Sequence, residues 1–180
     1  MINIILCGKA SDTSFSDALL PVLERYGGVQ YFSGKRLVRF GGGFPEFFLY
    51  DSEQLPQIEI KNGILLFKNS YHAAESVNIP PDFPCVLETK NLNAAAVLKD
   101  QNITVITCGT SAKDTISIAG LDETNAALSL QRSVITVDGR ILEPHDFTVR
   151  LVSKLGPHRI LAVCASLLLS GIDSSLEYVI

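Results

Sequence analysis

The sequence predicts an α/β protein: a single three-layer domain over residues 1–180, with a mixed, largely parallel sheet and a late antiparallel β-hairpin. Three observations predict this class. A β-branched apolar run at 2–7 is followed by an amphipathic helical pattern at 14–26. Strand-like, helix-like and strand-like segments then recur within about 25 residues. Finally, Asp138-Gly139 separates two short β-like runs and is a typical hairpin turn.

Length and composition are those of a globular domain. The chain has 180 residues, of which 47% are hydrophobic and 19% charged, a profile far from that of disordered chains. It is long enough to bury one sizeable core and short for two domains.

The first segments are a strand and a helix. Residues 2–7 are expected to form a buried strand. The following helix has an apolar stripe at helical spacing, formed by Phe15, Ala18, Leu19, Val22, Leu23 and Tyr26. Ser14 is a plausible N-cap, Pro21 is expected to kink the helix, and Gly27-Gly28 to end it.

Short extended runs fill the next part of the chain. Runs at 29–32 and 37–40 flank a turn, and an aromatic strand at 47–50 ends in Asp51. The runs at 58–60 and 64–67 flank Asn62-Gly63, which favours a hairpin. The second of these runs is also compatible with a central parallel strand.

The firmest topological inference concerns the middle of the chain. After a proline-containing loop or short helix at 70–84, residues 85–88, 92–98 and 103–108 read as strand, helix and strand. This order implies a right-handed crossover between two parallel strands.

The last third combines a hairpin with an apolar helix. Runs at 134–137 and 140–142 form the hairpin, whereas 147–155 is ambiguous between strand and helix. Pro157 suits the first position of a helix that runs to Ser170. Because apolar residues surround most of this helix, it needs cover on more than one side, part of which a partner subunit would provide.

The candidate site comes from a pattern that the chain uses twice. A strand ending in Cys-Gly is followed by a polar loop with a Lys, an Asp and a Thr, at 4–13 and again at 105–115. If both strands are parallel in one sheet, their loops emerge at the same edge, where open α/β sheets bind ligands. The expected ligand-binding residues are Gly8, Lys9, Ser11, Thr13, Gly109, Thr110, Ser111 and Lys113.

These residue types favour an anion. Two lysines would neutralise a phosphate, and the glycine amides and hydroxyls would bind its oxygens. Neither loop contains the G-x-x-x-x-G-K-[ST] pattern of a phosphate-binding loop. An ordinary strand-to-helix turn capped by small polar residues is the competing interpretation.

A divalent cation is a second expectation at the same edge. Asp51 ends an apolar strand, as does the acid that holds Mg²⁺ in many nucleotide-binding enzymes. With Asp12 or Asp114 it would hold Mg²⁺ beside a nucleotide or another phosphate ligand. A structural role is the alternative, because an acid at a strand end also caps turns.

Three further hypotheses follow from composition. A net charge of −4 and a pI near 5.3 argue against nucleic acid or an anionic membrane as the main partner. The absence of a signal-peptide pattern indicates a cytoplasmic protein. Four widely spaced cysteines favour buried free thiols, with thiol chemistry at Cys7 or Cys108 as a weaker option.

No motif names a reaction, so the sequence leaves open whether the chain is an enzyme. The leading hypothesis is a protein that binds a nucleotide or another phosphorylated small molecule at the carboxyl edge of its sheet. The competing hypothesis is a non-catalytic interaction or scaffolding module, a homo-oligomer formed through the apolar C-terminal helix or the late hairpin.

Overall fold

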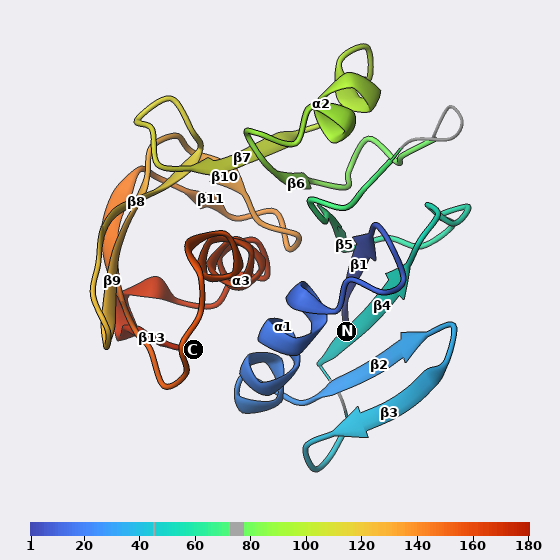
Figure 1. Ribbon diagram of the computed structural model, residues 1–180, viewed down its shortest axis with the longest axis horizontal. Helices are drawn as coiled ribbons and strands as arrows, with labels where there is room; N and C mark the ends of the chain where they lie inside the picture. The colour runs from blue at the N-terminus through green and yellow to red at the C-terminus, as the bar shows by residue number, and fades with distance from the viewer. Residues whose placement is uncertain (45, 73–77) are drawn as a thin grey trace.

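One 11-stranded mixed sheet runs through the whole molecule in the computed structural model, which describes residues 1–44, 46–72 and 78–180 (Figure 1). The strand order is β13-β12-β9-β8-β7-β6-β5-β1-β4-β2-β3, and β10 and β11 form a separate antiparallel pair. The strands are β1 (Ile2–Cys7), β2 (Val29–Ser33), β3 (Arg36–Phe40), β4 (Phe47–Ser52), β5 (Gly63–Phe67), β6 (Cys85–Glu88), β7 (Val105–Gly109), β8 (Ile116–Leu121), β9 (Asn125–Leu130), β10 (Val134–Ile135), β11 (Ile141–Leu142), β12 (His145–Arg150) and β13 (Tyr178–Val179). The helices are α1 (Ser14–Arg25), α2 (Leu92–Leu98), α3 (Pro157–Leu169) and the short 3-10 helix η1 (Ser174–Leu176).

The centre of the sheet is parallel and its flanks are mixed. Each neighbouring pair from β2 through β4, β1, β5, β6 and β7 to β8 is parallel. Strand β3 adds antiparallel to β2 at one edge, and β9 pairs antiparallel with both β8 and β12 at the other. The expected mixed, largely parallel sheet is therefore confirmed, as is the late hairpin, which is β10–β11.

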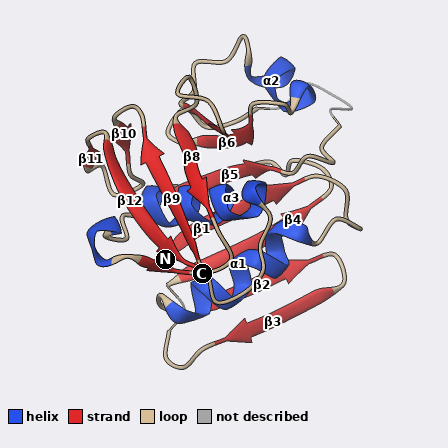
Figure 2. Ribbon diagram, turned by 60° about the vertical axis from the view of Figure 1, so that its left-hand side comes forward, coloured by secondary structure: helices blue, strands red, loops and turns tan. Residues whose placement is uncertain are grey.

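Helices cover the two faces of the sheet unequally (Figure 2). Alternate residues of β1 point to opposite faces. Ile4 and Leu6 belong to the larger core under α1 and α3, whereas Ile5 and Cys7 belong to the smaller core that contains Ala94 and Leu98 of α2. These two cores on either side of one sheet make the three layers that the sequence predicts.

Helix α3 is covered within the chain. Every residue from Ile160 to Leu169 is buried, against the parallel sheet, β8 and α1. Its apolar circumference therefore needs no partner subunit over this stretch. The C-terminal helix is thus not available as the self-association surface that the sequence suggested.

Two local expectations need correction. Ser14 is the first residue of α1 and not its N-cap, which is Thr13. Asn62-Gly63 does not form a hairpin: residues 58–60 form no strand, and β5 is a central strand parallel to β1. The ambiguous segment after Phe147 is the rest of β12 followed by a loop. Of the expected loop or short helix at 70–84, residues 73–77 lie outside the described part of the chain.

Connections from the central strands diverge next to β1, and this creates the candidate site. After β1 the chain passes through α1 on one face of the sheet before it enters β2. After the neighbouring strand β4, the connection to β5 contributes Leu55 and Ile58 to the opposite core. The carboxyl ends of β1 and β4 therefore form a topological switch point, the place where open α/β sheets hold ligands.

Candidate functional site

A cavity of about 560 Å³ lies at this switch point. Its walls come from the loop after β1, the first turn of α1, the turn between β2 and β3, and the end of β4. The lining residues are Lys9, Ala10, Ser11, Thr13, Ser16, Asp17, Tyr31, Ser33, Gly34, Lys35, Arg36, Asp51 and Glu53. Three residues of the first predicted loop, Lys9, Ser11 and Thr13, thus line one cavity together with Asp51.

The base of this cavity is built around a lysine that sequence reasoning did not select. Lys68 directly follows β5, and its side chain is completely buried. Its ammonium lies 2.5 Å from Oδ1 of Asp51, whose side chain is 5% exposed. The ammonium also donates to the carbonyl oxygens of Asp12 at 2.7 Å and Lys9 at 3.3 Å. Lys68 therefore ties the first loop to the end of β4.

Three backbone amides of the first loop donate hydrogen bonds within the protein. The amide of Gly8 donates to the carbonyl of Ser52, and that of Lys9 donates to the Ser70 hydroxyl. The amide of Asp12 donates back to the Lys9 carbonyl. Amides that cradle a phosphate must instead point at the ligand. The amides of Gly8, Lys9 and Asp12 are therefore used within the protein and do not point at a ligand.

Asp12 is a structural acid of the same loop. Its Oδ1 accepts from the amide and hydroxyl of Ser14, and its Oδ2 accepts from the hydroxyl of Ser70. Desolvation by burial acts to raise the pKa of Asp12, but these hydrogen bonds and the charge of Lys68 outweigh it and lower the pKa below its ordinary value. Asp12 therefore stays ionised and fixes the start of α1.

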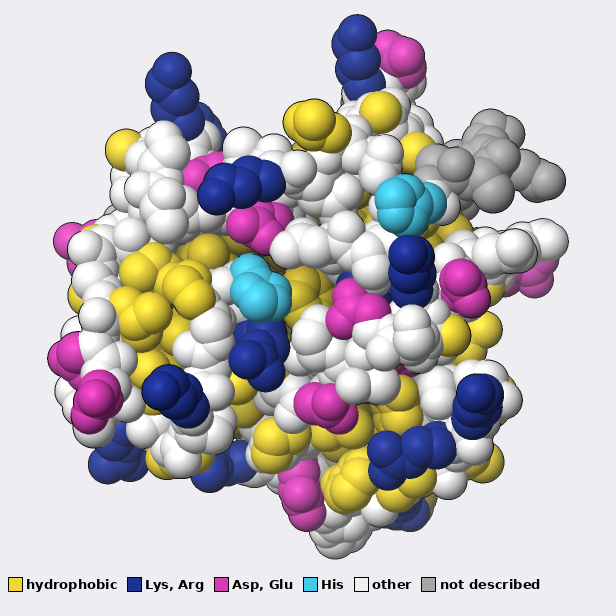
Figure 3. Space-filling view, in the orientation of Figure 1, with side chains coloured by type: hydrophobic (Ala, Val, Ile, Leu, Met, Phe, Trp, Pro, Cys, Tyr) yellow, Lys and Arg dark blue, Asp and Glu magenta, His cyan; other side chains and the backbone are white. Residues whose placement is uncertain are grey.

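The rim of the cavity carries both signs of charge. Lys9, Lys35 and Arg36 are basic, and Asp17 and Glu53 are acidic. On the face of the molecule seen in Figure 3, Lys and Arg side chains are similarly interspersed with Asp and Glu and do not gather into one basic patch.

A cation–π contact and a hydrogen bond connect the rim of the cavity to its base. The Arg36 guanidinium lies 5.8 Å from the centre of the Tyr31 ring, and the Tyr31 hydroxyl is 3.4 Å from Oδ2 of Asp51. Arg36, Tyr31, Asp51 and Lys68 thus form a continuous path from solvent to the buried ammonium. We therefore expect a substitution of Arg36 at the rim to alter the surroundings of the Asp51–Lys68 pair at the base.

The second predicted loop lies at the same edge of the sheet but outside this cavity. Strands β1 and β7 point the same way, as expected, yet β5 and β6 separate them by about 14 Å. None of the second-loop residues Gly109, Thr110, Ser111, Lys113 and Asp114 lines the cavity.

Asp114 holds the second loop together instead. Its carboxylate accepts from the Thr89 hydroxyl and from the Ser111 amide, and it is buried. Asp114 thus lies outside the cavity that Asp51 lines, and a cation held by Asp51 with Asp12 or Asp114 stays a prediction. Among the described residues, no three His, Cys, Asp or Glu side chains are grouped as they would be around a metal ion.

The four cysteines are free and buried. Burial raises the pKa of the Cys7 thiol to about 12, an effect that nearby Lys68 opposes. Burial, together with Asp114 and Glu88, also raises the pKa of Cys108. A reactive cysteine needs its thiolate favoured, so neither position has the environment of a nucleophile.

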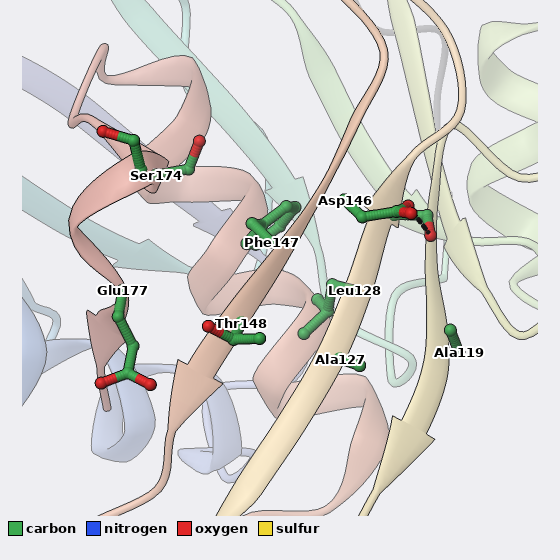
Figure 4. Close-up of a pocket in the computed structure, with 10 residues that line it drawn as sticks. Ala119, Ala127, Leu128, Asp146, Phe147, Thr148, Ser174 and Glu177 are labelled. Carbon is green, nitrogen blue, oxygen red and sulfur yellow. Dashed lines mark hydrogen bonds between the residues drawn. The ribbon is translucent and has the colours of Figure 1, made fainter.

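A second cavity, of about 370 Å³, lies on the outer face of β8, β9 and β12 near η1 (Figure 4). Its walls include Ala119, Ala127 and Thr148, and its charged groups are the carboxylates of Asp146 and Glu177. Asp146 already accepts a hydrogen bond from Ser129. With acids alone as its charged groups, this cavity does not favour a phosphate.

The late hairpin keeps an apolar surface. Ile135 and Ile141 are cross-strand partners in β10–β11, with exposed fractions of 58% and 63%. This is the part of the expected self-association surface that the fold leaves open, and homo-oligomer formation through it stays a prediction.

A membrane-spanning helix needs a long apolar stretch, and none of the helices in the described part of the chain has one.

No family model and no curated protein matches this sequence. Solved structures do match its fold. One is the UDP-N-acetylmuramate:L-alanyl-γ-D-glutamyl-meso-diaminopimelate ligase of Neisseria meningitides, at 12% identity and a TM-score of 0.59, over 95% of this chain and 62% of that one. Another is the murein peptide ligase of Psychrobacter arcticus, at 8% identity and a TM-score of 0.56, over 93% of this chain and 44% of that one.

A third structure is a MurF ligase from Thermotoga maritima in complex with ADP, at 12% identity and a TM-score of 0.50, over 93% of this chain and 44% of that one. This chain therefore spans between 44% and 62% of the length of these ligases. At such low identity the likeness concerns the fold alone. The chain has the α/β fold found in these Mur ligase structures.

Proposed function

We propose that this chain binds a small phosphorylated ligand, with a nucleotide as the leading class, in the cavity between the loop at 8–13 and the turn at 33–36. The observation that carries the proposal is the position of the cavity at the topological switch point between β1 and β4. Its volume of about 560 Å³ lies within the usual range for small-molecule sites.

Side chains, more than backbone amides, would recognise the anion. The ammonium groups of Lys9 and Lys35 and the guanidinium of Arg36 would contact phosphate oxygens. The Ser11 hydroxyl would donate a further hydrogen bond, and the Thr13 hydroxyl would do so on turning away from Asp17, to which it donates without a ligand. This assignment retains Lys9, Ser11 and Thr13 of the first loop and leaves out Gly8 and the second loop, which do not line the cavity.

The likeness to solved structures supports a nucleotide as the first class to test. The Thermotoga maritima MurF ligase structure, which shares the fold, is a complex with ADP. The fold is therefore compatible with a nucleotide.

The test compares two lysines on the same edge of the sheet. Thermal unfolding is measured against AMP, ADP, ATP, pyrophosphate and sugar phosphates. A ligand at about 100 times its Kd stabilises by about 2.7 kcal/mol, which for a domain of this size raises Tm by about 5 to 10 °C. We expect Lys9→Ala to abolish the shift, because Lys9 lines the cavity.

Lys113→Ala is the matched control, since Lys113 is also exposed and also follows a Cys-Gly strand end. It should leave the shift unchanged. Equal losses in the two variants would contradict the assignment to this cavity, and no shift with any ligand of the panel would contradict the proposed function itself.

A further inference from the structure

We infer that the Lys68 ammonium is a built-in cation that takes the place of a divalent metal ion at the base of the cavity. The site would then take its anion in metal-free form. The part of this inference that concerns the anion rests on the proposed function, whereas the part that concerns the metal does not.

The surroundings of the ammonium are those of a cation site. Its three oxygen neighbours are one carboxylate oxygen, from Asp51, and two backbone carbonyls, from Lys9 and Asp12, at distances of 2.5 to 3.3 Å. Carboxylate and carbonyl oxygens are the ligands that Mg²⁺ and Ca²⁺ take in proteins. A lysine ammonium has three N–H donors, so these three oxygens use all of them.

The backbone of Lys68 is fixed as firmly as its side chain. Its amide donates to the Cys7 carbonyl, and its own carbonyl accepts from Tyr71 and from the side chain of Asn91, the N-cap residue of α2. The position of the ammonium is therefore set by β1, β5 and α2 together. A charge held in this way is preorganised before any ligand arrives.

In the described part of the chain, the carboxylates at the base are already paired and none is left over to attract a metal ion. Oδ1 of Asp51 is paired with Lys68, and Oδ2 faces the Tyr31 hydroxyl. The carboxylate of Asp12 is used by Ser14 and Ser70. At the rim a phosphate would meet the positive charges of Lys9, Lys35 and Arg36 beside the acids Asp17 and Glu53. Beneath the rim, the fully buried Lys68 ammonium neutralises the charge of Asp51, so that no metal ion is needed to do so.

Removal of the lysine side chain should convert this base into a metal site. Lys68→Ala vacates the position of the ammonium and leaves the Asp51 carboxylate facing two carbonyls. Mg²⁺ commonly binds through one or two carboxylates and retains several waters, and the vacated volume provides room for them.

The first experiment uses the wild-type protein. Binding of ADP and of pyrophosphate is measured by calorimetry in EDTA and again with excess Mg²⁺. The same affinity in both conditions is expected. A tenfold or larger gain with Mg²⁺, about 1.4 kcal/mol, would overturn the inference.

The second experiment needs no anion. Thermal unfolding of wild type, Lys68→Ala and the double variant Lys68→Ala/Asp51→Asn is followed in MgCl₂ or CaCl₂ and in EDTA. Only the single variant should gain stability from the cation, by about 5 °C or more at saturation. Lys9→Ala, which removes a lysine from the same loop but outside the buried pair, is the control and should not respond.

The two arms separate the two proposals. If the wild type binds no anion under either condition, the proposed function fails while the response of Lys68→Ala to metal still tests the built-in cation. If Lys68→Ala responds to metal no more than Lys9→Ala, or does not fold even with metal present, the built-in cation is overturned whatever the anion data show.

Discussion

Lys68 determines the local conformation of the first loop. A buried ion pair contributes little compared with an apolar pair of the same shape, but removal of one partner typically costs about 3–5 kcal/mol because the other charge stays buried. Gly8 is part of the same arrangement: an added Cβ there would lie 2.7 Å from Cβ of Lys68. Gly8 is therefore needed for the close approach of Lys68.

Asp12 predicts a pH dependence of stability. Its pKa is lowered in the folded state, so its hydrogen bonds stabilise the fold above the unfolded value of about 3.8 and are lost as the pH falls through the lower folded value. We expect the free energy of unfolding, measured by urea denaturation from pH 6 down to pH 2, to decrease below about pH 4. Asp12→Asn, which cannot ionise, should be less stable at pH 6 and lose less on acidification.

Other carboxylates also contribute to the pH dependence of stability. Hydrogen bonds in the folded state lower the pKa values of Asp122, Asp138 and Asp173 as well. Some acid sensitivity therefore remains in Asp12→Asn. Identical pH profiles for the variant and the wild type would contradict the structural role given to Asp12.

The sequence identified one partner of the central ion pair and missed the other. The position of Asp51 at the end of an apolar strand indicates a site residue, and Asp51 does line the cavity. Lys68 has the same kind of signal, a charged residue directly after the buried run Gly63–Phe67, but it lies in no glycine-rich loop. The two residues are brought together through β1, which lies between β4 and β5, and sequence spacing carries no information on that strand order.

Periodicity predicted most individual elements well, and turn chemistry was less reliable. The helices at 14–25 and 157–169 and the crossover at 85–109 follow from apolar spacing. Asn62-Gly63 has the residues of a hairpin turn, and Asn62 does adopt a positive φ of 57°. The run after it is buried on both faces, which is the pattern of a central parallel strand, and that burial overrides the turn signal.

Gly63 marks where this strand enters the core. A Cβ at this position would lie 2.2 Å from the ring of Phe83, which is fully buried. We expect Gly63→Ala to lower the free energy of unfolding by about 1–3 kcal/mol through overpacking, measured by urea denaturation. Gly42→Ala is the control, because no atom lies within 4 Å of its Cβ position, and it should change stability by less than about 0.5 kcal/mol. Equal effects in the two variants would contradict the packing argument.

The molecule as a whole explains why only half of the repeated sequence pattern belongs to one site. Both Cys-Gly strands are parallel in one sheet, so the prediction that their loops share an edge is correct. Their separation by β5 and β6 depends on chain connections far from either loop. Sequence similarity between two loops indicates similar local structure, and it does not place them beside each other.

Residues Tyr178–Ile180 join distant parts of the molecule. At the end of α1, the Val179 carbonyl accepts from the Arg25 guanidinium, and the Val179 amide donates to the Tyr26 hydroxyl. At β12, the Ile180 amide donates to the Arg150 carbonyl, and the Ile180 carbonyl accepts from the Val152 amide. The Tyr178 ring is buried against Tyr26 and Phe147, and its hydroxyl donates to the Ile172 carbonyl. This segment therefore connects the first helix to the antiparallel end of the sheet.

Substitution of Tyr178 should consequently destabilise both regions together. We expect Tyr178→Ala to cost about 3–5 kcal/mol, as for other large buried aromatic side chains, and Tyr178→Phe about 1 kcal/mol for the lost hydrogen bond, both measured by urea denaturation. In Tyr178→Ala, hydrogen exchange should accelerate in α1 and β12 alike, because Tyr178 packs on residues from both. Faster exchange in β12 with unchanged protection of α1 would contradict this expectation. The contact between Tyr26 and Tyr178 would then not couple the stability of α1 to that of β12, and the two ends of the sheet would be held together by the strands between them.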